Sequence, residues 1–345
     1  MLYSLCLMSL DMMILLIFAL EYKYQDRTRL RKGEKQMRKK SKCSMCKSKA
    51  FISLKYAGIR LCKEHFKTYF INRVAKTIKK YQMIKHNEKI LIGVSGGKDS
   101  IAMLHALTEI LKDTNELMAV HIDLGINEYS TKSREIFNQI CSTIKIENKV
   151  ISIKEKYGFT INEAVRKIRR PPCSICGLIK RRILNEYALE INADKIATGH
   201  TLDDEVTFLM LNYINGNINM LLKRKPHLPK IHEKLIARIK PLCEISDLET
   251  QIYCLINNLK YIEIPCPYAQ DSPILKFKKI IMQLEEIRPG TKLSLLRNFT
   301  NKIYKALESH YSDKVDQKIN ECIKCGYPTS QDLCAFCRLK EKVLS

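Results

Sequence analysis

Residues 94–100, Val-Ser-Gly-Gly-Lys-Asp-Ser, combine the residue types that bind an anion at the end of a strand. They follow the apolar run 89–93 and precede a segment with helical periodicity. Glycines let the backbone approach a ligand closely, and N–H groups at a helix start bind phosphate. Ser95 and Ser100 add hydroxyl groups, and Lys98 adds a positive charge. The loop therefore predicts a phosphate site. An ordinary strand-to-helix turn that happens to hold two glycines is the alternative.

Two common phosphate-binding motifs do not match this loop. A Walker A loop separates its first glycine from Gly-Lys by four residues, and the dinucleotide fingerprint spaces three glycines as G-x-G-x-x-G. Here Gly96 and Gly97 are adjacent, and Lys98, Asp99 and Ser100 follow directly. The order resembles the PP-loop of the ATP pyrophosphatases, which cleave ATP to AMP and pyrophosphate and adenylate a substrate.

The PP-loop resemblance implies where the rest of the nucleotide lies. The adenine would rest against the second strand, flanked by Val120, His121 and Ile122. The later run Thr-Gly-His-Thr-Leu-Asp-Asp would place Gly199 near the nucleotide and its two aspartates at the next helix start. For Asp203, a helix N-cap is the alternative to a catalytic role.

Three cysteines lie in the middle of the chain. Cys173 and Cys176 form a C-x-x-C pair before a predicted helix, and Cys266 stands between two prolines. Such a pair can be redox-active, bind zinc or hold an iron–sulfur cluster. A closed zinc site needs a fourth protein ligand, and no obvious one stands beside Cys266. Three thiolates leave one iron of a 4Fe-4S cluster open, where sulfide can bind. A redox disulfide remains the alternative, because helix N-termini lower the pKa of a thiol.

Two outer sets of residues have the paired spacing of tetrahedral structural zinc sites. The first set is Cys43, Cys46, Cys62 and His65, and the second is Cys322, Cys325, Cys334 and Cys337. Each module is too short to bury a core, so we expect the metal to supply its folding free energy. Contact of these modules with RNA is a secondary interpretation.

Strands and helices alternate between the two outer sets. Apolar runs predict strands over residues 89–94, 117–125, 149–153, 195–199 and 237–242. Helical periodicity predicts helices over residues 69–84, 99–112, 133–144, 176–191, 203–214 and 246–259. This order indicates an α/β fold with a doubly wound parallel sheet, flanked by the two zinc modules. The expected domains are an extension over 1–41, a zinc module over 42–68, a PP-loop domain over 69–315 and a second zinc module over 316–345.

The composition favours a polyanionic partner. The 345 residues include 60 Lys+Arg and 36 Asp+Glu, a formal net charge of +24. Nucleic acid is the usual partner of such a chain, and a compositional bias towards Lys, Ile and Asn is the alternative explanation. Most of the 14 cysteines stand in close pairs, which indicates metal ligation under cytosolic redox conditions. The cysteines outside the sets are expected to be small buried hydrophobes; they are Cys6, Cys141, Cys243 and Cys254.

The N-terminal extension has an apolar stretch, Met12–Leu20, followed by a basic run, Lys23–Lys42. It lacks the positive residues that begin a signal peptide, Asp11 interrupts it, and it is short for a bilayer span. We expect translation to begin at Met37 and the protein to be cytoplasmic, without stable membrane association. A membrane anchor is the alternative.

Together, these motifs resemble those of the tRNA 2-thiolation enzymes. The shared features are the PP-loop, the C-x-x-C followed by Gly-Leu-Ile-Lys-Arg, the later lone cysteine and the flanking zinc modules. Residues 61–66, with His65 in place of a fourth cysteine, and residues 121–130 and 325–338 are similar to the TtuA type in particular. The similarity runs from Lys42 to about Lys340, and the N-terminal extension departs from it.

This resemblance implies an ATP-dependent tRNA sulfurtransferase that adenylates the C2 oxygen of a uridine. Sulfur would come from a ubiquitin-like carrier with a thiocarboxylate, pass through the cluster and displace AMP. The implied cofactors are ATP with Mg2+, one 4Fe-4S cluster and two Zn2+, and the implied assembly is a homodimer. The expected substrate is the T-loop 5-methyluridine at position 54. The alternatives are the wobble uridine at position 34, a zinc-knuckle tRNA-binding protein without sulfur chemistry, and a PP-loop ligase without it.

The resemblance also implies a role for each matching residue. Cys173, Cys176 and Cys266 match the cluster ligands. Lys180 would polarise the phosphate or the developing oxyanion, with a basic helix face as its alternative role, and Asp204 would serve proton transfer or metal binding. The expected catalytic set is Lys180, Asp204 and Asp99. The expected ATP ligands are Val94, Ser95, Gly96, Gly97, Lys98, Asp99, Ser100, His121, Ile122, Lys180 and Gly199.

Overall fold

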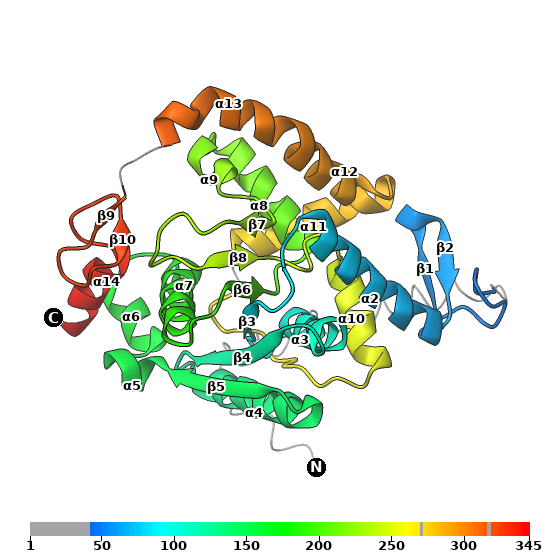
Figure 1. Ribbon diagram of the computed structural model, residues 1–345, viewed down its shortest axis with the longest axis horizontal. Coiled ribbons are helices and arrows are strands. Elements are labelled where there is room, and N and C mark those ends of the chain that lie inside the picture. Colours follow the sequence, from blue (N-terminus) through cyan, green and yellow to red (C-terminus); the bar gives the residue numbers. More distant parts are fainter. Residues whose placement is uncertain (1–41, 270–271, 316–318) are drawn as a thin grey trace, which may run out of the picture. The chain divides into compact units, whose positions relative to one another are not determined.

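The computed structural model describes residues 42–269, 272–315 and 319–345 (Figure 1). The N-terminal extension, residues 1–41, with Cys6 and the expected start at Met37, lies outside these residues. Contacts within the chain divide it into two compact units, with the boundary after Phe66. No helix in the described part of the chain has both the length and the apolar character needed to cross a bilayer.

The first unit is built around a short antiparallel hairpin. Its elements are β1 (Ile52–Leu54), the 3-10 turn η1 (Lys55–Ala57), β2 (Ile59–Leu61) and the first turn of α2 (Lys63–Lys80). Ile52 pairs with Leu61, and these two side chains are buried together with Phe66. So small a core stabilises little by itself, which is consistent with a module that depends on a bound metal.

A six-stranded sheet forms the centre of the second unit. Its strands are β3 (Lys89–Gly93), β4 (Glu116–Asp123), β5 (Glu147–Ser152), β6 (Lys195–Thr198), β7 (His227–Leu228) and β8 (Ala237–Ile239). They lie in the order β5-β4-β3-β6-β8-β7, and all neighbouring pairs are parallel except β7 with β8. The predicted doubly wound sheet is confirmed, and the antiparallel edge strand β7 is an addition that the sequence did not indicate.

Helices cover both faces of this sheet. The helices of the second unit are α2 beyond Phe66, α3 (Lys98–Leu111), α4 (Asn127–Ile144), α5 (Ile153–Tyr157), α6 (Ile161–Lys167), α7 (Pro172–Glu190), α8 (Leu202–Ile214), α9 (Ile218–Leu222), α10 (Asp247–Ile256), α11 (Pro273–Ile287), α12 (Thr291–Asn298), the π-helix η2 (Phe299–Ile303), α13 (Tyr304–Val315) and α14 (Ala335–Leu344). Side chains alternate along β4. Met118 packs on Tyr187 of α7, whereas His121 stacks on Phe137 of α4, so α7 and α4 lie on opposite faces.

The strand order places the switch point of the sheet at β3. Consecutive crossovers lead from β3 to β4 on one side, and the chain later returns to β6 on the other. Ligands of doubly wound sheets bind in the crevice at the carboxyl ends of such strands. The loop 94–97 leaves β3 there, and Gly199 follows β6 at the same edge. The helix α7 precedes β6, so its N-terminal turn with Cys173 and Cys176 also lies at the carboxyl edge.

The C-terminal module, residues 319–345, packs against α7. It contains the short strands β9 (Asn320–Glu321) and β10 (Pro328–Thr329) and the helix α14. Apolar side chains of α14, such as Phe336 and Leu339, join one buried cluster with Ile175 and Ile179 of α7. Figure 1 shows α6 and α14 beside α7, and both contact it. The module is therefore part of the second unit.

Candidate active site

The loop 94–100 forms the turn between β3 and α3 that the sequence predicts. Gly97 caps the N-terminus of α3, so the first N–H groups of the helix face the loop. The hydroxyls of Ser95 and Ser100 lie 3.1 Å apart, and Ser100 accepts the Ser95 N–H at 3.1 Å and donates to the Gly97 carbonyl at 2.9 Å. These bonds fix the loop in a shape suited to an anion, as in other helix-start phosphate sites.

Two glycines are required by the geometry around the loop. Gly96 has φ +83°, and an added Cβ would lie 3.0 Å from the Cβ of Ser133 on α4. Gly199, from the loop after β6, approaches the phosphate loop so closely that an added Cβ would lie 3.1 Å from the backbone N and Cα of Ser100. The structure therefore brings the two predicted nucleotide loops into direct contact.

The predicted adenine site lies at the carboxyl end of β4. His121 is buried and its Nδ1 lies 2.8 Å from the Val94 carbonyl, so it carries the proton on Nδ1 when it donates this bond. Burial lowers the pKa of His121, which keeps the ring neutral. Its Nε2 is buried and has no hydrogen-bond partner among the described residues. The ring is thus held in one orientation with an acceptor nitrogen available.

Lysines and carboxylates alternate around the phosphate loop. Lys98 lies 2.7 Å from Asp99 and 3.9 Å from Asp247. On the other side of Asp247, Lys278 of α11 lies 3.1 Å away. Lys278 also pairs with Asp204 at 2.5 Å. A phosphate entering here would meet lysine side chains that carboxylates already hold in place.

The electrostatics of this network are dominated by its shared carboxylates. Burial, together with Asp247 and Asp204, raises the pKa of Asp99 to about 6 in spite of the adjacent Lys98. Burial alone would raise the pKa of Asp247, but Lys98 and Lys278 hold it below its ordinary value. The lysines therefore favour the ionised form of Asp247, whereas burial favours the protonated form of Asp99.

The two aspartates after Gly199 lie in the first turn of α8, at the helix start that the sequence predicts. The N-cap of α8 is Thr201, whose side chain accepts the Asp204 N–H while Asp204 Oδ2 accepts the Thr201 N–H at 3.1 Å. The N-cap interpretation of Asp203 is therefore wrong. Asp203 is buried, pairs with Lys292 at 2.8 Å and accepts the Asp247 N–H at 3.0 Å. Thr201, two residues earlier, is the N-cap instead, and it forms a capping box with Asp204.

The three inner cysteines, Cys173, Cys176 and Cys266, converge from two segments distant in sequence. Cys176 and Cys266 are partly buried against one apolar cluster, and Cys173 is exposed with its Sγ 3.8 Å from the Tyr268 carbonyl. Burial, and then the neighbouring Cys176 and Cys266, raises the pKa of the Cys173 thiol. These sulfur atoms are thus close enough to interact, as a shared ligand requires.

Lys180 lies among these cysteines. The pKa of Lys180 is raised by the neighbouring Cys176, against the effect of burial, with Tyr129 and Cys266 acting in the same direction as Cys176. Cys176 and Lys180 are one helical turn apart on α7, so they share a face of that helix. Besides burial, Lys180 also lowers the pKa of His121 on β4, so it lies near both the inner cysteines and the predicted adenine site. The alternative of a solvated basic face does not fit this position.

The inner cysteines differ from the outer sets in their spacing. Among the described residues, only the outer two sets hold three or more ligand atoms within 4.8 Å of one another. A single tetrahedral zinc ion, with Zn–S near 2.3 Å, needs sulfurs about 3.8 Å apart. A four-iron cluster is larger than one ion and holds its thiolates farther apart. Three thiols without a fourth ligand therefore fit a cluster with one open iron better than zinc.

Both outer sets have the geometry of a four-ligand zinc site. In the first, Sγ of Cys46 and Cys62 lie 3.8 Å apart, and Nδ1 of His65 lies 3.2 Å from Sγ of Cys62. In the second, Sγ of Cys325 and Cys334 also lie 3.8 Å apart. The two Sγ–Sγ distances match the edge of a tetrahedron with Zn–S near 2.3 Å, about 3.8 Å. The chain thus provides eight suitable donors, and His65 would bind through Nδ1.

Several residues of the site were missed by the sequence analysis. Asp247, Lys278 and Lys292 stand far from the loop in sequence and have no diagnostic spacing. Thr250 of α10 donates to Asp99 and was likewise missed. The only available signal was the Ser-Asp-Leu-Glu capping box at residues 246–249, which predicts a helix start but not its neighbour in space.

Comparisons with known proteins agree with this arrangement. Residues 67–270 match the family model of a PP-loop domain, and residues 42–67 match that of the N-terminal LIM domain of the 2-thiouridine synthetase TtuA. The chain is 41% identical over 297 residues to the tRNA-5-methyluridine(54) 2-sulfurtransferase of Pyrococcus horikoshii, which covers 86% of this chain and 93% of that protein. The protein of the same name from Thermotoga maritima is 35% identical, covering 88% and 97%.

A solved structure is similar over most of its length. The U34-tRNA thiolase NcsA from Methanococcus maripaludis, described with its 4Fe-4S cluster, is 31% identical with a TM-score of 0.72. The match covers 87% of this chain and 95% of that one.

We predict that the purified protein carries about two zinc ions per chain, because each outer set offers four ligands in tetrahedral spacing. Elemental analysis of anaerobically purified protein measures this content. The Cys334→Ser variant should lose about one zinc and melt at a lower temperature, whereas Cys141→Ala should keep both ions. Folded protein with a zinc content near zero contradicts the assignment.

We also predict that Lys278→Met weakens ATP binding by about tenfold or more, since it removes a cation that faces the phosphate loop and leaves two carboxylates without their shared partner. Nucleotide titration calorimetry measures the effect. Lys279→Met is the matched control, because that lysine is the exposed neighbour on the same helix. Equal ATP affinity of the two variants would remove Lys278 from the nucleotide site.

Proposed function

The chain belongs to the TtuA-type tRNA 2-thiolation enzymes, and from this membership we propose that it replaces the C2 oxygen of the T-loop 5-methyluridine, position 54 of tRNA, by sulfur. It is an ATP-dependent tRNA sulfurtransferase, so the family resemblance of its motifs is confirmed. The LIM match and the relatives named for position 54 support the T-loop. NcsA, named for U34, keeps wobble thiolation as the alternative.

The observation that carries the proposal is the convergence of two sites at one edge of the sheet. The phosphate loop leaves β3, and α7, which carries Cys176 and Lys180 in its N-terminal half, begins at the same edge. A nucleotide site alone would suit many adenylating enzymes. The inner cysteines beside it have no role in a ligase without sulfur chemistry or in a protein that only binds tRNA.

The loop and its surroundings bind and orient ATP. The N–H groups at the start of α3 hold the phosphates, with Lys98 and Lys278 as countercharges. Mg2+ would bind between the phosphates and the nearby carboxylates, of which Asp99 and Asp247 are the candidates. Asp204 can reach the metal only through Oδ1, because Oδ2 is engaged in the capping box, and Lys278 must then move to phosphate.

Adenylation is a displacement at the α-phosphorus. The C2 oxygen of the uridine attacks that atom as N3 loses its proton, and the bond to the bridging oxygen breaks to release pyrophosphate. Lys180 stabilises the negative charge that develops on the oxygens of the α-phosphate during the displacement. In the second step sulfur bonds to C2, the C2–O bond breaks, and AMP leaves with the former C2 oxygen. Holding the reactants in line is the main contribution of the site.

Cys173, Cys176 and Cys266 are the residues that would hold a 4Fe-4S cluster. When bound, the cluster supplies an iron without a protein ligand, at which sulfide can be held. The chain's own contribution is positional, since α7 fixes two of the thiols and the Pro-Cys-Pro segment fixes the third. The outer sets would each hold one zinc ion with a structural role.

Family membership also motivates three further proposals on the setting of the reaction. The sulfur donor is a ubiquitin-like carrier protein with a C-terminal thiocarboxylate. The active form is a homodimer, and the enzyme acts in the cytoplasm. Copurification with a small thiocarboxylated protein and light scattering of the reconstituted enzyme test the first two.

The proposed substrate is tested by mapping the modification. Anaerobic, reconstituted enzyme with ATP, a sulfide source and a tRNA that carries 5-methyluridine 54 should yield 2-thio-5-methyluridine in the T-loop fragment. Mass spectrometry of nuclease fragments separates this fragment from the anticodon fragment. Sulfur found only in the anticodon fragment supports the wobble alternative, and an absence of sulfur from both contradicts thiolation altogether.

Single changes at the inner cysteines should abolish thiolation. We expect Cys173→Ala, Cys176→Ala and Cys266→Ala to lose activity by at least 100-fold, or about 2.7 kcal/mol of transition-state stabilisation. The iron content after reconstitution should fall while the ATP affinity remains. Cys141→Ala is the matched control, since that thiol is buried in the core away from the site. Full activity with iron chelated out would return the site to disulfide or persulfide chemistry.

A further inference from the structure

Beside the inner cysteines, three arginines from separate elements approach one another; we call Arg181, Arg224 and Arg238 the arginine cluster. Arg181 belongs to α7, Arg224 follows α9, and Arg238 lies in β8. The Arg238 guanidinium donates to the Arg181 carbonyl at 3.3 Å. Burial and then the charges of Arg238 and Arg224 lower the pKa of Arg181, which records their proximity. Three like charges at one place repel each other unless an anion lies among them.

The protein itself provides few carboxylates to pair with these arginines. Among the described residues, no carboxylate forms an ion pair with Arg181 or Arg238. Arg224 is 4.0 Å from Glu205, but the same carboxylate already pairs with Lys240 at 2.6 Å. The Nε of Arg224 is buried without a hydrogen-bond partner in the described part of the chain. The cluster thus has unused donor capacity.

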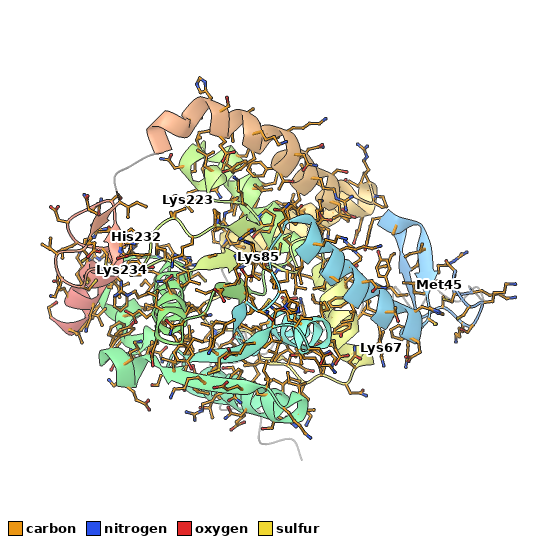
Figure 2. The ribbon with its side chains drawn as sticks, viewed as in Figure 1. Met45, Lys67, Lys85, Lys223, His232 and Lys234 are labelled. Carbon is orange, nitrogen blue, oxygen red and sulfur yellow. The ribbon has the colours of Figure 1, made fainter. Side chains whose placement is uncertain are left out.

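The arginine cluster continues into a basic segment, residues 223–234, which joins α9 to β8 and includes β7. Its sequence, Lys-Arg-Lys-Pro-His-Leu-Pro-Lys-Ile-His-Glu-Lys, contains a single carboxylate. Figure 2 shows Lys223, His232 and Lys234 along this segment towards the C-terminal module. Lys223 and Lys230 are exposed, and Lys234 is held at the module by Glu321, 2.6 Å away. The charges form a row rather than one point.

The row leads to the sulfur site. An added Cβ at Gly177 would lie 3.2 Å from Nη1 of Arg181, so that side chain extends back along α7 to the neighbour of Cys176, and Cys176 acts, against burial, to raise the pKa of Arg181. At the other side, the charge of Arg224 contributes, after burial, to lowering the pKa of His200, the residue after Gly199. The arginine cluster therefore lies near both the inner cysteines and the loop that follows β6.

We propose that the arginine cluster and the basic segment bind the phosphates of the tRNA strand that flanks the target uridine. This inference rests on the proposed function for the identity of the substrate. Planar guanidinium groups bind phosphate in a bidentate manner, and successive phosphates match a row of cations. Contacts of this kind position the strand without reading its sequence. A carrier protein with a single C-terminal thiocarboxylate offers one anion and leaves most of the row unused.

The test uses tRNA affinity rather than thiolation. In filter binding of an unmodified tRNA transcript to the full chain, Lys223→Gln/Lys230→Gln should raise Kd about tenfold and reduce the slope of log K against log salt by about one to two. Arg181→Gln should raise Kd further. The double change is confined to exposed side chains, so it leaves folding intact. Lys112→Gln/Lys149→Gln removes two exposed lysines elsewhere and should change Kd less than twofold.

The outcomes separate this inference from the proposed function. Weakened tRNA binding with a reduced salt slope supports the inference, even if the bound tRNA is thiolated at another position. Unchanged affinity and slope in both the lysine and the Arg181 variants overturn it. The inference is also overturned if tRNA affinity is retained while crosslinking to a thiocarboxylated carrier is lost, because the surface then binds the carrier.

Discussion

The carboxylate of Asp247 joins the segments that make the nucleotide site. It lies 3.9 Å from Lys98 of the phosphate loop and 3.1 Å from Lys278 of α11, and it accepts the hydroxyl of Thr201 at the start of α8. Segments from four parts of the chain therefore meet at one ionised group. Since burying an ion without partners costs several kcal/mol, Asp247 and its lysines must be in place together or not at all. This mutual requirement keeps the site formed before ATP arrives.

The same arrangement prepares the site for a polyanion. A phosphate site built of lysines alone would repel itself in the absence of nucleotide. Here each lysine is paired with a carboxylate, and ATP with Mg2+ can exchange those pairs for phosphate–lysine and carboxylate–metal pairs. In the described part of the chain, Arg181 and Arg238 form no ion pair with a carboxylate and Arg224 shares Glu205 with Lys240, which is why we assign the arginine cluster to the backbone of a bound RNA rather than to a resident group.

Sequence reasoning succeeded where chemistry is local and failed where it is assembled in space. Residues 94–100 are consecutive, so the strand, loop and helix could be predicted together, and the paired spacings defined the outer metal sets because short modules close on themselves. Asp247, Lys278 and Lys292 come from helices that begin far along the chain, and no periodicity marks a side chain that faces a neighbour. The strand β7, with two residues, was too short to give an alternating pattern. Helices α11 to α13 were also not predicted, although apolar spacing is present in α11.

The position of α7 links the C-terminal metal site to the sulfur chemistry. One face of this helix carries Cys176 and Lys180, and its apolar face carries Ile175 and Ile179 into the cluster shared with α14. On the same side of the helix as Ile175, the Arg182 guanidinium lies 4.0 Å from the ring centroid of Tyr327 and pairs with Glu186 at 2.5 Å. Tyr327 stands between the cysteine pairs of the module, so its place depends on the ion they bind. A zinc ion with no part in the reaction would thus still determine where Cys176 and Lys180 stand relative to the phosphate loop.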